Sequence, residues 1–218
     1  MLAGPSEDQQ SLYRLAFAKN CFVLVVRAYG GLDTRDLGTA EEPHITGELV
    51  RLARMLIESD EAEPWMEHME VLDDPPQALA GRHGKKRPRI DIEVVRTGRG
   101  RRPRFHIEAK RLYRGDSVNE YFGLSGLRMF INGAYAGGWP SAGMLGYVQS
   151  DTWAVWLRRL ASGIADRRVE LCVCLGFPDW MPAGWADEGL ENVHTSCHER
   201  PLQDLGRVRI YHLLLELT

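Results

Sequence analysis

Three side chains in the middle of the chain have the types and the spacing that hydrolysis of a phosphodiester requires. Asp91 ends the stretch KKRPRID, and Glu108 and Lys110 follow in the stretch FHIEAKRL. Residues i and i+2 of a β-strand share one face and lie roughly 6.5–7 Å apart, so Glu108 and Lys110 can converge on one point. Two strands at about 88–95 and 104–112, joined as a hairpin through RTGRGRRP, would bring Asp91 to the same point.

A carboxylate pair of this kind is typical of a metal site. Neighbouring carboxylates raise each other's pKa unless a cation lies between them, and Mg²⁺ binds one or two carboxylates while it keeps several waters. We therefore expect Asp91 and Glu108 to bind Mg²⁺ or Mn²⁺. A lysine beside the ion can orient or deprotonate a water, or stabilise charge on a phosphate, which is the role expected of Lys110. The alternative is a surface ion pair between Glu108 and Lys110. Glu93 shares a face with Asp91 and is expected to be a further ligand or, in the favoured alternative, a solvated charge.

A basic segment surrounds these residues. Positions 82–114 contain thirteen lysine and arginine residues and three acidic residues, while the rest of the chain contains 14 basic and 27 acidic residues. Such a local excess indicates a polyanionic partner. The arginines expected to contact nucleic-acid phosphates lie in the hairpin connector, and the alternative is a solvated loop. They are Arg99, Arg101, Arg102 and Arg104.

Length and composition are those of one soluble globular domain. The chain has 218 residues, of which 44% are hydrophobic and 26% charged, enough for a full core. No apolar run has the length of a transmembrane helix, and the start MLAGPSEDQQ lacks the features of a signal peptide. We therefore expect a cytoplasmic protein with reduced thiols and no membrane association.

The cysteines offer a competing chemistry. Cys172 and Cys174 share a strand face, and the stretch HTSCHE supplies His194, Cys197 and His198, so four of these side chains could bind zinc. A C-x-C pair on a straight strand has poor geometry for one ion, and cysteine is among the most buried residue types. Core cysteines are therefore the favoured interpretation.

Hydrophobic periodicity predicts a mixed α/β (α+β) fold with a central sheet flanked by helices. A helix beginning near Pro43 has the stripe Ile45, Leu49, Leu52 and Leu56. The other expected elements are a strand or buried helix end within 11–28, a short strand at 65–74, the strands at 88–95 and 104–112, a second helix ending near Tyr135 with Leu124, Leu127 and Ile131 on one face, a strand at 143–148, a third helix at 151–164 that Asp151 caps, and strands at 168–177 and 206–218.

Asp91 followed by Glu108-Ala-Lys110 resembles the PD-(D/E)xK motif of the restriction-endonuclease-like nucleases, although the proline, Pro88, precedes Asp91 by three residues. That family has a core of one helix, three antiparallel strands, a helix and a further strand. The stretch EEPHITGEL is similar to the family's first-helix element E-x-x-I-T, which puts Glu42 in the acidic position. A helical wheel alone leaves Glu41, Glu42 and Glu48 as candidates.

Two further blocks are similar to uncharacterised bacterial members linked to phage defence. They are GLSGLRMFINGAYAGGWPSAGMLGYV and TSCHERP followed by IYHLLLEL. With the motif they cover about 41–218, so the chain is expected to be a single nuclease domain with 1–40 as an N-terminal extension. The S-x-H-x-R element implies that His198 and Arg200 touch the scissile phosphate or the substrate backbone. The alternative is that they cap the end of a strand.

The sequence thus predicts a Mg²⁺-dependent endonuclease in anti-phage defence, with DNA as the favoured substrate. Asp91 and Glu108 would hold the ion, Lys110 would orient the attacking water, and Glu42 would support this metal or a second one. The alternatives are a non-catalytic nuclease-fold protein that binds nucleic acid or a partner, and a pure interaction subunit. There is no Walker motif, so an ATPase or helicase would be a separate chain. Another defence-system protein and a second copy are the remaining candidate partners.

Overall fold

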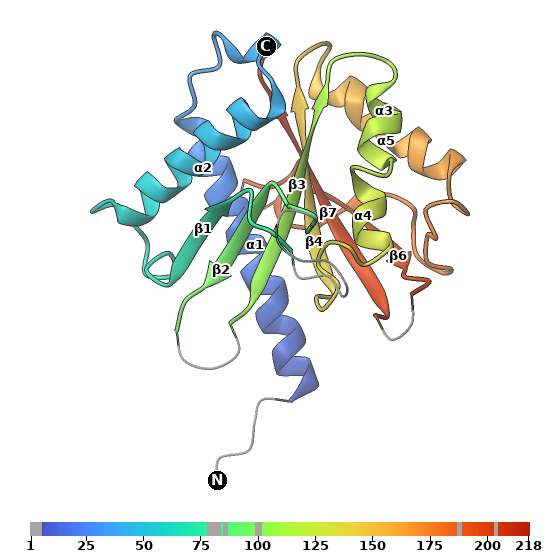
Figure 1. The fold of residues 1–218 in the computed structure, drawn as a ribbon, viewed down its shortest axis with the longest axis horizontal. Helices are drawn as coiled ribbons and strands as arrows, with labels where there is room; N and C mark the ends of the chain where they lie inside the picture. Colours follow the sequence, from blue (N-terminus) through green and yellow to red (C-terminus); the bar gives the residue numbers. More distant parts are fainter. Residues whose placement is uncertain (1–5, 78–83, 85–86, 99–101, 187–188, 203–204) are drawn as a thin grey trace.

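The computed structural model describes residues 6–77, 84, 87–98, 102–186, 189–202 and 205–218. Their strands form one mixed sheet in the order β1-β2-β3-β4-β7-β6-β5. β1 (Met69–Asp73), β2 (Ile92–Arg96) and β3 (Arg104–Leu112) form an antiparallel meander. β4 (Ser141–Val148) and β7 (Arg207–Glu216) continue it in parallel, and β6 (His194–Glu199) and β5 (Met181–Pro182) complete it in antiparallel fashion (Figure 1). The predicted mixed α/β class with a central sheet is confirmed.

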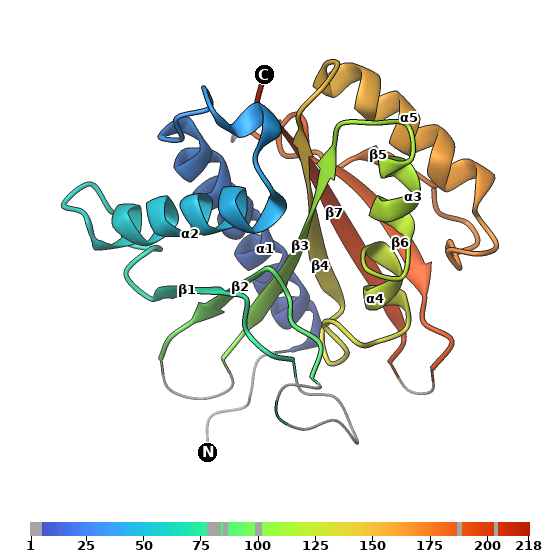
Figure 2. The same cartoon turned by 45° about the horizontal axis from the view of Figure 1, so that its top comes forward.

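Helices cover both faces of the sheet (Figure 2). α1 (Glu7–Gly30) and α2 (Glu42–Glu58), with the short 3₁₀ turn η1 (Leu37–Thr39) between them, pack on one face. α3 (Ser117–Phe122), α4 (Leu127–Ile131) and α5 (Trp153–Asp166) pack on the other. Because side chains alternate along a strand, each strand supplies both cores: Ile107 and Ala109 of β3 lie in the first, and Leu112 in the second.

The stretch expected as a strand or buried helix end within 11–28 is a long helix. The Ser6 hydroxyl accepts a hydrogen bond from the Gln9 amide, and the Gln9 side chain accepts one from the Ser6 amide, which makes a capping box. The second half of α1 is buried against the sheet, with Cys21, Phe22 and Leu24 at 0% exposure. Residues 1–40 were expected to form an N-terminal extension. Within them, α1 supplies buried side chains to the core on its face of the sheet.

The second predicted helix is two short helices, which corrects that expectation. α3 ends before Gly123 and α4 begins after Gly126. A Cβ on Gly126 would collide with the backbone carbonyl of Tyr121, so only glycine permits this close turn. Leu124, expected on the buried face, is 69% exposed in the connection.

Two other local predictions are wrong for backbone reasons. Residues 168–177 form turns, with the Leu171 and Val173 amides bonded to carbonyls four and five residues back, and Cys172 has φ +48°, outside the extended region. An isolated bridge, Val173 with His198, and the contact of His198 with the Leu171 carbonyl join them to the sheet. Thr152 precedes α5 instead of Asp151, which pairs with Arg159 at 2.6 Å.

Candidate active site

The candidate site forms where β2 and β3 separate. Their ladder ends at the pair Ile92–Ile107. Before Ile92 the chain stays with the β1 side, since the Asp74 amide donates to the Asp91 carbonyl at 2.9 Å. The amide of Ala109, left without a β2 partner, donates instead to Oδ2 of Asp91 at 2.7 Å. Asp91 therefore accepts the hydrogen bond of a β3 amide that β2 does not reach. This bond holds its side chain in the notch, the gap where β2 and β3 separate.

Glu108 and Lys110 point into the same notch from β3. Nζ of Lys110 donates to Oε1 of Glu108 at 2.8 Å, to Oε1 of Glu42 at 3.0 Å and to the carbonyl oxygen of Ala109 at 2.6 Å. Glu108 is 4% exposed and Lys110 is 8% exposed. The period-2 expectation that these two side chains meet is therefore met in the structure, but their ion pair is buried, not on the surface.

The first turn of α2 supplies the third carboxylate. Glu42 is the first residue of α2, and the Thr46 hydroxyl one turn later is 3.0 Å from the Tyr147 hydroxyl of β4, a buried contact that fixes the start of the helix over the sheet. The other two candidate acids point elsewhere: Glu41 pairs with Arg111 at 2.8 Å, and Glu48 pairs with Arg51. Of the three candidates, Glu42 alone contacts Lys110 among the described residues.

Burial shapes the protonation of this cluster. Burial raises the pKa of Glu108 well above its usual value, and the charge of Asp91 raises it further. Burial likewise raises the pKa of Glu42 and of Asp91, in each case partly offset by Lys110. Burial alone would lower the pKa of Lys110, but its carboxylate neighbours outweigh burial and raise it. One cation thus faces three carboxyl groups in a desolvated notch, and each of the three holds a proton more readily than an exposed carboxyl group does.

The carboxylate cluster offers a hard cation part of the ligand set that it requires. Across the described residues, no three histidine, cysteine, aspartate or glutamate side chains are arranged as a ready-made metal site, and Nζ of Lys110 is hydrogen-bonded to both Glu42 and Glu108. However, Oε2 of Glu108 is buried and has no hydrogen-bond partner in the described structure. A buried carboxyl oxygen that accepts no hydrogen bond, beside a second carboxyl group, Asp91, is chemically suited to Mg²⁺, which needs only one or two carboxylates.

The structure adds a neighbour to the notch that the sequence did not indicate. Tyr135, beyond α4, donates from its hydroxyl to the carbonyl of Arg89. Burial raises the pKa of Tyr135, and the charges of Glu108 and Asp91 raise it further, so the phenol lies within their field. No spacing rule connects Tyr135 to the motif; only the turn after α4 brings it there.

Glu93, considered as an additional ligand, belongs to a separate buried group. It is 2% exposed and accepts a hydrogen bond from Nε2 of Gln77 at 3.0 Å. Its other oxygen pairs with Arg104, and His106 lies 3.6 Å away. Arg104, expected to contact phosphates, is thus engaged by Glu93 through one guanidinium nitrogen.

The remaining residues of the expected nucleic-acid contact are placed unevenly. Arg102 is exposed, and Arg99 and Arg101 lie outside the described residues. His198 is 0% exposed, with Nδ1 2.7 Å from the Leu171 carbonyl oxygen. A side chain without accessible surface cannot touch a phosphate, so this part of the expectation is corrected to a structural role.

Arg200 is also held inside the fold. It is 7% exposed, and its guanidinium donates to several backbone carbonyls, among them Ala136 at 3.0 Å and Trp139 at 2.8 Å. These bonds fasten the turn after α4 to the end of β6. The alternative stated for this residue, a role at a strand end, therefore describes it better than a substrate contact.

The cysteine and histidine residues weighed for zinc do not surround one point. Sγ of Cys174 and Sγ of Cys197 are 2.8 Å apart in the core, and His198 is bonded to Ser196 on the other side of β6. Burial raises the pKa of Cys174 to about 12, so it is a neutral thiol.

No family model matches the chain, and no curated protein or solved structure shows significant similarity to it. The candidate site therefore stands on the positions of Glu42, Asp91, Glu108 and Lys110. None of the described helices is long and apolar enough to cross a membrane.

Proposed function

We propose that the protein is a metal-dependent nuclease that hydrolyses phosphodiester bonds of nucleic acid, with DNA as the favoured substrate. The observation that carries the proposal is one buried cluster assembled from three separate elements. Asp91 precedes β2, Glu108 and Lys110 lie on β3, and Glu42 begins α2. Within this cluster, Oε2 of Glu108 is buried and accepts no hydrogen bond in the described structure, so it is available to a cation.

The topology around the cluster supports a restriction-endonuclease-like core. α2 is followed by the antiparallel strands β1, β2 and β3, then by α3 and α4, and then by β4 parallel to β3. This is the element order that the PD-(D/E)xK resemblance implies. The motif residues lie at the point where β2 and β3, the second and third strands of such a core, diverge.

Asp91 and Glu108 are the residues that would hold the ion. Mg²⁺ or Mn²⁺ there would polarise the scissile phosphate and lower the pKa of a bound water. A cation there would favour the charged forms of both carboxyl groups, against the burial that raises their pKa values. Glu42 would support this site, or a second ion, across Lys110.

Lys110 is placed to act as a fixed cationic hydrogen-bond donor. Its Nζ makes three contacts within 3.0 Å, so the side chain is positioned before substrate arrives. Its raised pKa keeps it protonated near neutral pH. We therefore assign it the orientation of the attacking water and stabilisation of phosphate charge, and not proton abstraction.

The surroundings suit a polyanionic substrate. A cavity of about 370 Å³ is lined by Arg87, Arg104 and His106, and His106 lies one strand repeat from Glu108 on the same face of β3. With the basic segment 82–114, Arg87 and Arg104 would hold the backbone near the notch, whereas burial lowers the pKa of His106 to about 4 and keeps that ring neutral near pH 7. A role in bacterial anti-phage defence, with an ATPase, a helicase or a second copy as partner, remains part of the proposal through the family resemblance.

The experiment is a cleavage assay on linear duplex, circular duplex and single-stranded DNA and on RNA, each with Mg²⁺, Mn²⁺ or EDTA. Cleavage that depends on the divalent ion and disappears in the Glu108→Gln variant supports the proposal. Cleavage that persists in this variant would assign the activity to another site or to a contaminant.

A second candidate function has one observation in its favour. Lys110 already neutralises part of the carboxylate cluster without any metal, which is what a non-catalytic nuclease-fold protein that binds nucleic acid or a partner would retain. Absence of cleavage on every substrate and ion, together with salt-dependent DNA binding, would favour this candidate.

A further inference from the structure

Two thiols are in contact where the turns of 168–177 meet the sheet. Sγ of Cys174 and Sγ of Cys197 are 2.8 Å apart, and all four cysteines of the chain are reduced thiols in this structure. A disulfide bond is about 2.05 Å long, so a small movement of the two side chains would join these sulfur atoms.

The backbone holds the two cysteines opposite each other. The Cys174 amide donates to the Cys197 carbonyl oxygen at 2.8 Å, and an isolated antiparallel bridge joins their neighbours Val173 and His198. This register places Cys174 directly across from Cys197. Opposed residues of an antiparallel pair have Cα atoms roughly 4.5–5.5 Å apart, and a disulfide spans Cα atoms that are about 4.4–6.8 Å apart.

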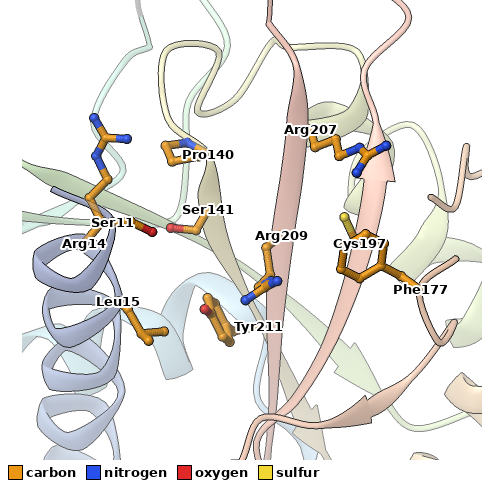
Figure 3. Close-up of a pocket in the computed structure, with 10 residues that line it drawn as sticks. All are labelled: Ser11, Arg14, Leu15, Pro140, Ser141, Phe177, Cys197, Arg207, Arg209 and Tyr211. Carbon is orange, nitrogen blue, oxygen red and sulfur yellow. The ribbon is translucent and has the colours of Figure 1, made fainter. Parts of the chain in front are cut away.

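The two thiols differ in their access to a reagent. Cys174 has 0% exposure, whereas Cys197 has 6% and lines two adjoining cavities of about 320 and 400 Å³. Figure 3 shows Cys197 with Phe177 and Arg207 on the wall of the first cavity. A small oxidant can therefore reach Cys197, and the buried Cys174 lies beside it as a second thiol. An accessible cysteine next to a resolving cysteine is typical of a redox-sensitive pair.

The other two cysteines are placed differently. Cys21 is buried in α1 with 0% exposure. Cys172 is half-buried, and its Sγ is 4.0 Å from the Glu170 carbonyl oxygen. Cys172 is therefore a matched control for Cys174, because it lies two residues away in the same turns and its sulfur has a different contact.

We propose that Cys174 and Cys197 are a redox modification site, at which a hydroperoxide converts the two thiols into a reversible disulfide. The Cys197 thiol loses its proton, and its sulfur attacks one peroxide oxygen. The O–O bond breaks, Cys197 becomes a sulfenic acid, and the other oxygen leaves as water. The Cys174 sulfur then attacks the sulfenic sulfur, and the displaced hydroxyl leaves as water with the Cys174 proton. The sulfur pair loses two electrons, which reduce the peroxide to two waters.

The disulfide would link the turns of 168–177 covalently to β6 and close the chain that contains β5. A dithiol would reverse the reaction by thiol–disulfide exchange. In a reducing compartment a disulfide of this kind is transient and responds to oxidant. Neither thiol belongs to the carboxylate cluster, so the proposal is independent of the nuclease activity proposed above.

The test is peptide mapping of the full chain by mass spectrometry. The reduced protein is treated with hydrogen peroxide, the remaining thiols are alkylated, and the chain is digested without reductant. The expected product is a cross-linked peptide pair, Cys174 with Cys197, that disappears after treatment with dithiothreitol. Alkylated thiols at both positions, oxidation of Cys197 to sulfinic acid without a cross-link, or a product that mainly joins Cys172 to Cys197 overturns the proposal.

Variants assign the roles of the two thiols. Cys174→Ser removes the resolving thiol, so oxidation of Cys197 should stop at the sulfenic acid, which dimedone captures. Cys172→Ser should form the Cys174–Cys197 disulfide as the wild type does. Loss of the cross-link in Cys172→Ser, or no dimedone adduct at Cys197 in Cys174→Ser, overturns the proposal. Mapping of the wild type decides the outcome even where Cys174→Ser does not fold.

Discussion

Two buried polar clusters lie in one row across the same face of the sheet, and they differ in charge and in hydrogen bonding. They are the carboxylate–lysine cluster around Glu108 and the serine–histidine cluster around His212. In the strand register Glu108 pairs with Met144, and Met144 pairs with His212, so a single methionine separates them. At one end, the carboxylate–lysine cluster is charged and has an unpartnered oxygen. At the other end, the serine–histidine cluster is neutral and fully bonded.

The serine–histidine cluster forms one chain of hydrogen bonds. The Tyr121 hydroxyl is 3.0 Å from Nδ1 of His212, and the Ser196 hydroxyl lies 2.8 Å from Nε2 of His212 and 2.7 Å from Nε2 of His198. Burial lowers the pKa of both histidines. A neutral network in which every polar group is hydrogen-bonded stabilises one packing of the core, whereas a charged cluster with an oxygen that accepts no hydrogen bond is suited to a ligand. Burial of polar groups alone therefore does not mark a functional site.

The largest expected difference concerns activity at the charged end. Glu42→Gln should lower the cleavage rate about 10²–10⁴-fold, because it removes a charge that positions Lys110 and supports the ion. Glu41→Gln, one residue earlier and paired on the surface with Arg111, should cleave at the wild-type rate. Rates on one DNA substrate at saturating Mg²⁺ measure this, and equal losses in both variants would break the assignment of Glu42.

A substitution in the serine–histidine cluster should lower the stability of the fold and leave the cleavage rate unchanged. His212→Leu leaves the Tyr121 hydroxyl without its buried partner and removes one of the two partners of the Ser196 hydroxyl, so the free energy of unfolding should fall by about 2–4 kcal/mol. The rate of cleavage per folded molecule should stay the same, since His212 is separated from Glu108 by Met144. Urea unfolding and active-fraction measurements test this, and a loss of rate without a loss of stability would contradict the structural role.

The two clusters should have opposite effects on the free energy of unfolding as the pH falls. Burial lowers the pKa of His198 to about 4, so between that value and about 6.5 the unfolded state binds more protons and acid destabilises the fold, by about 3 kcal/mol for His198 alone. Glu108 has a raised pKa, so in the folded state it binds protons more readily, and acid stabilises the fold through it.

Unfolding free energies measured from pH 7 to pH 4.5 separate these contributions. The stability of the wild type should fall with acid, and Glu108→Gln, which removes the opposing carboxyl, should show a steeper fall. An identical pH profile for the two proteins would mean that the carboxyl of Glu108 is not perturbed in the folded state.

The smallest effect is a gain in stability. Asp91→Asn keeps an oxygen that can accept the Ala109 amide hydrogen bond. It removes a buried carboxyl group whose pKa is raised mainly by burial. In metal-free buffer the variant should be more stable by about 1 kcal/mol. Added Mg²⁺ should stabilise the wild type and not the variant, and a variant that is less stable in both buffers would argue against electrostatic strain in the notch.

Much of the site was predictable from the sequence because strand periodicity is a local property. The spacing of Glu108 and Lys110 fixes their common face, and the hairpin pattern brings Asp91 to them. The contact of Glu42 with Lys110 depends on how α2 docks on β3 and β4. A helical wheel therefore left Glu41 and Glu48 as candidates.

The wrong predictions occur where the backbone overrides an apolar pattern. The run at 168–177 has strand-like composition, but Cys172 adopts a positive φ and the segment turns. Gly123 and Gly126 break the predicted second helix. The hydrogen bonds of His212 and Ser196 were not predictable from the sequence, because they join β6, β7 and α3, which are distant in the chain.

The most direct test of the central claim is Lys110→Ala, measured for both Mg²⁺ affinity and cleavage rate. A lysine that orients water beside a metal site, without binding the ion, predicts Mg²⁺ affinity within a few-fold of wild type and a cleavage rate lower by about 10²–10⁴. A variant that cleaves DNA as fast as the wild type, or a wild type that cleaves no nucleic acid with any divalent ion, would contradict a catalytic role for this cluster.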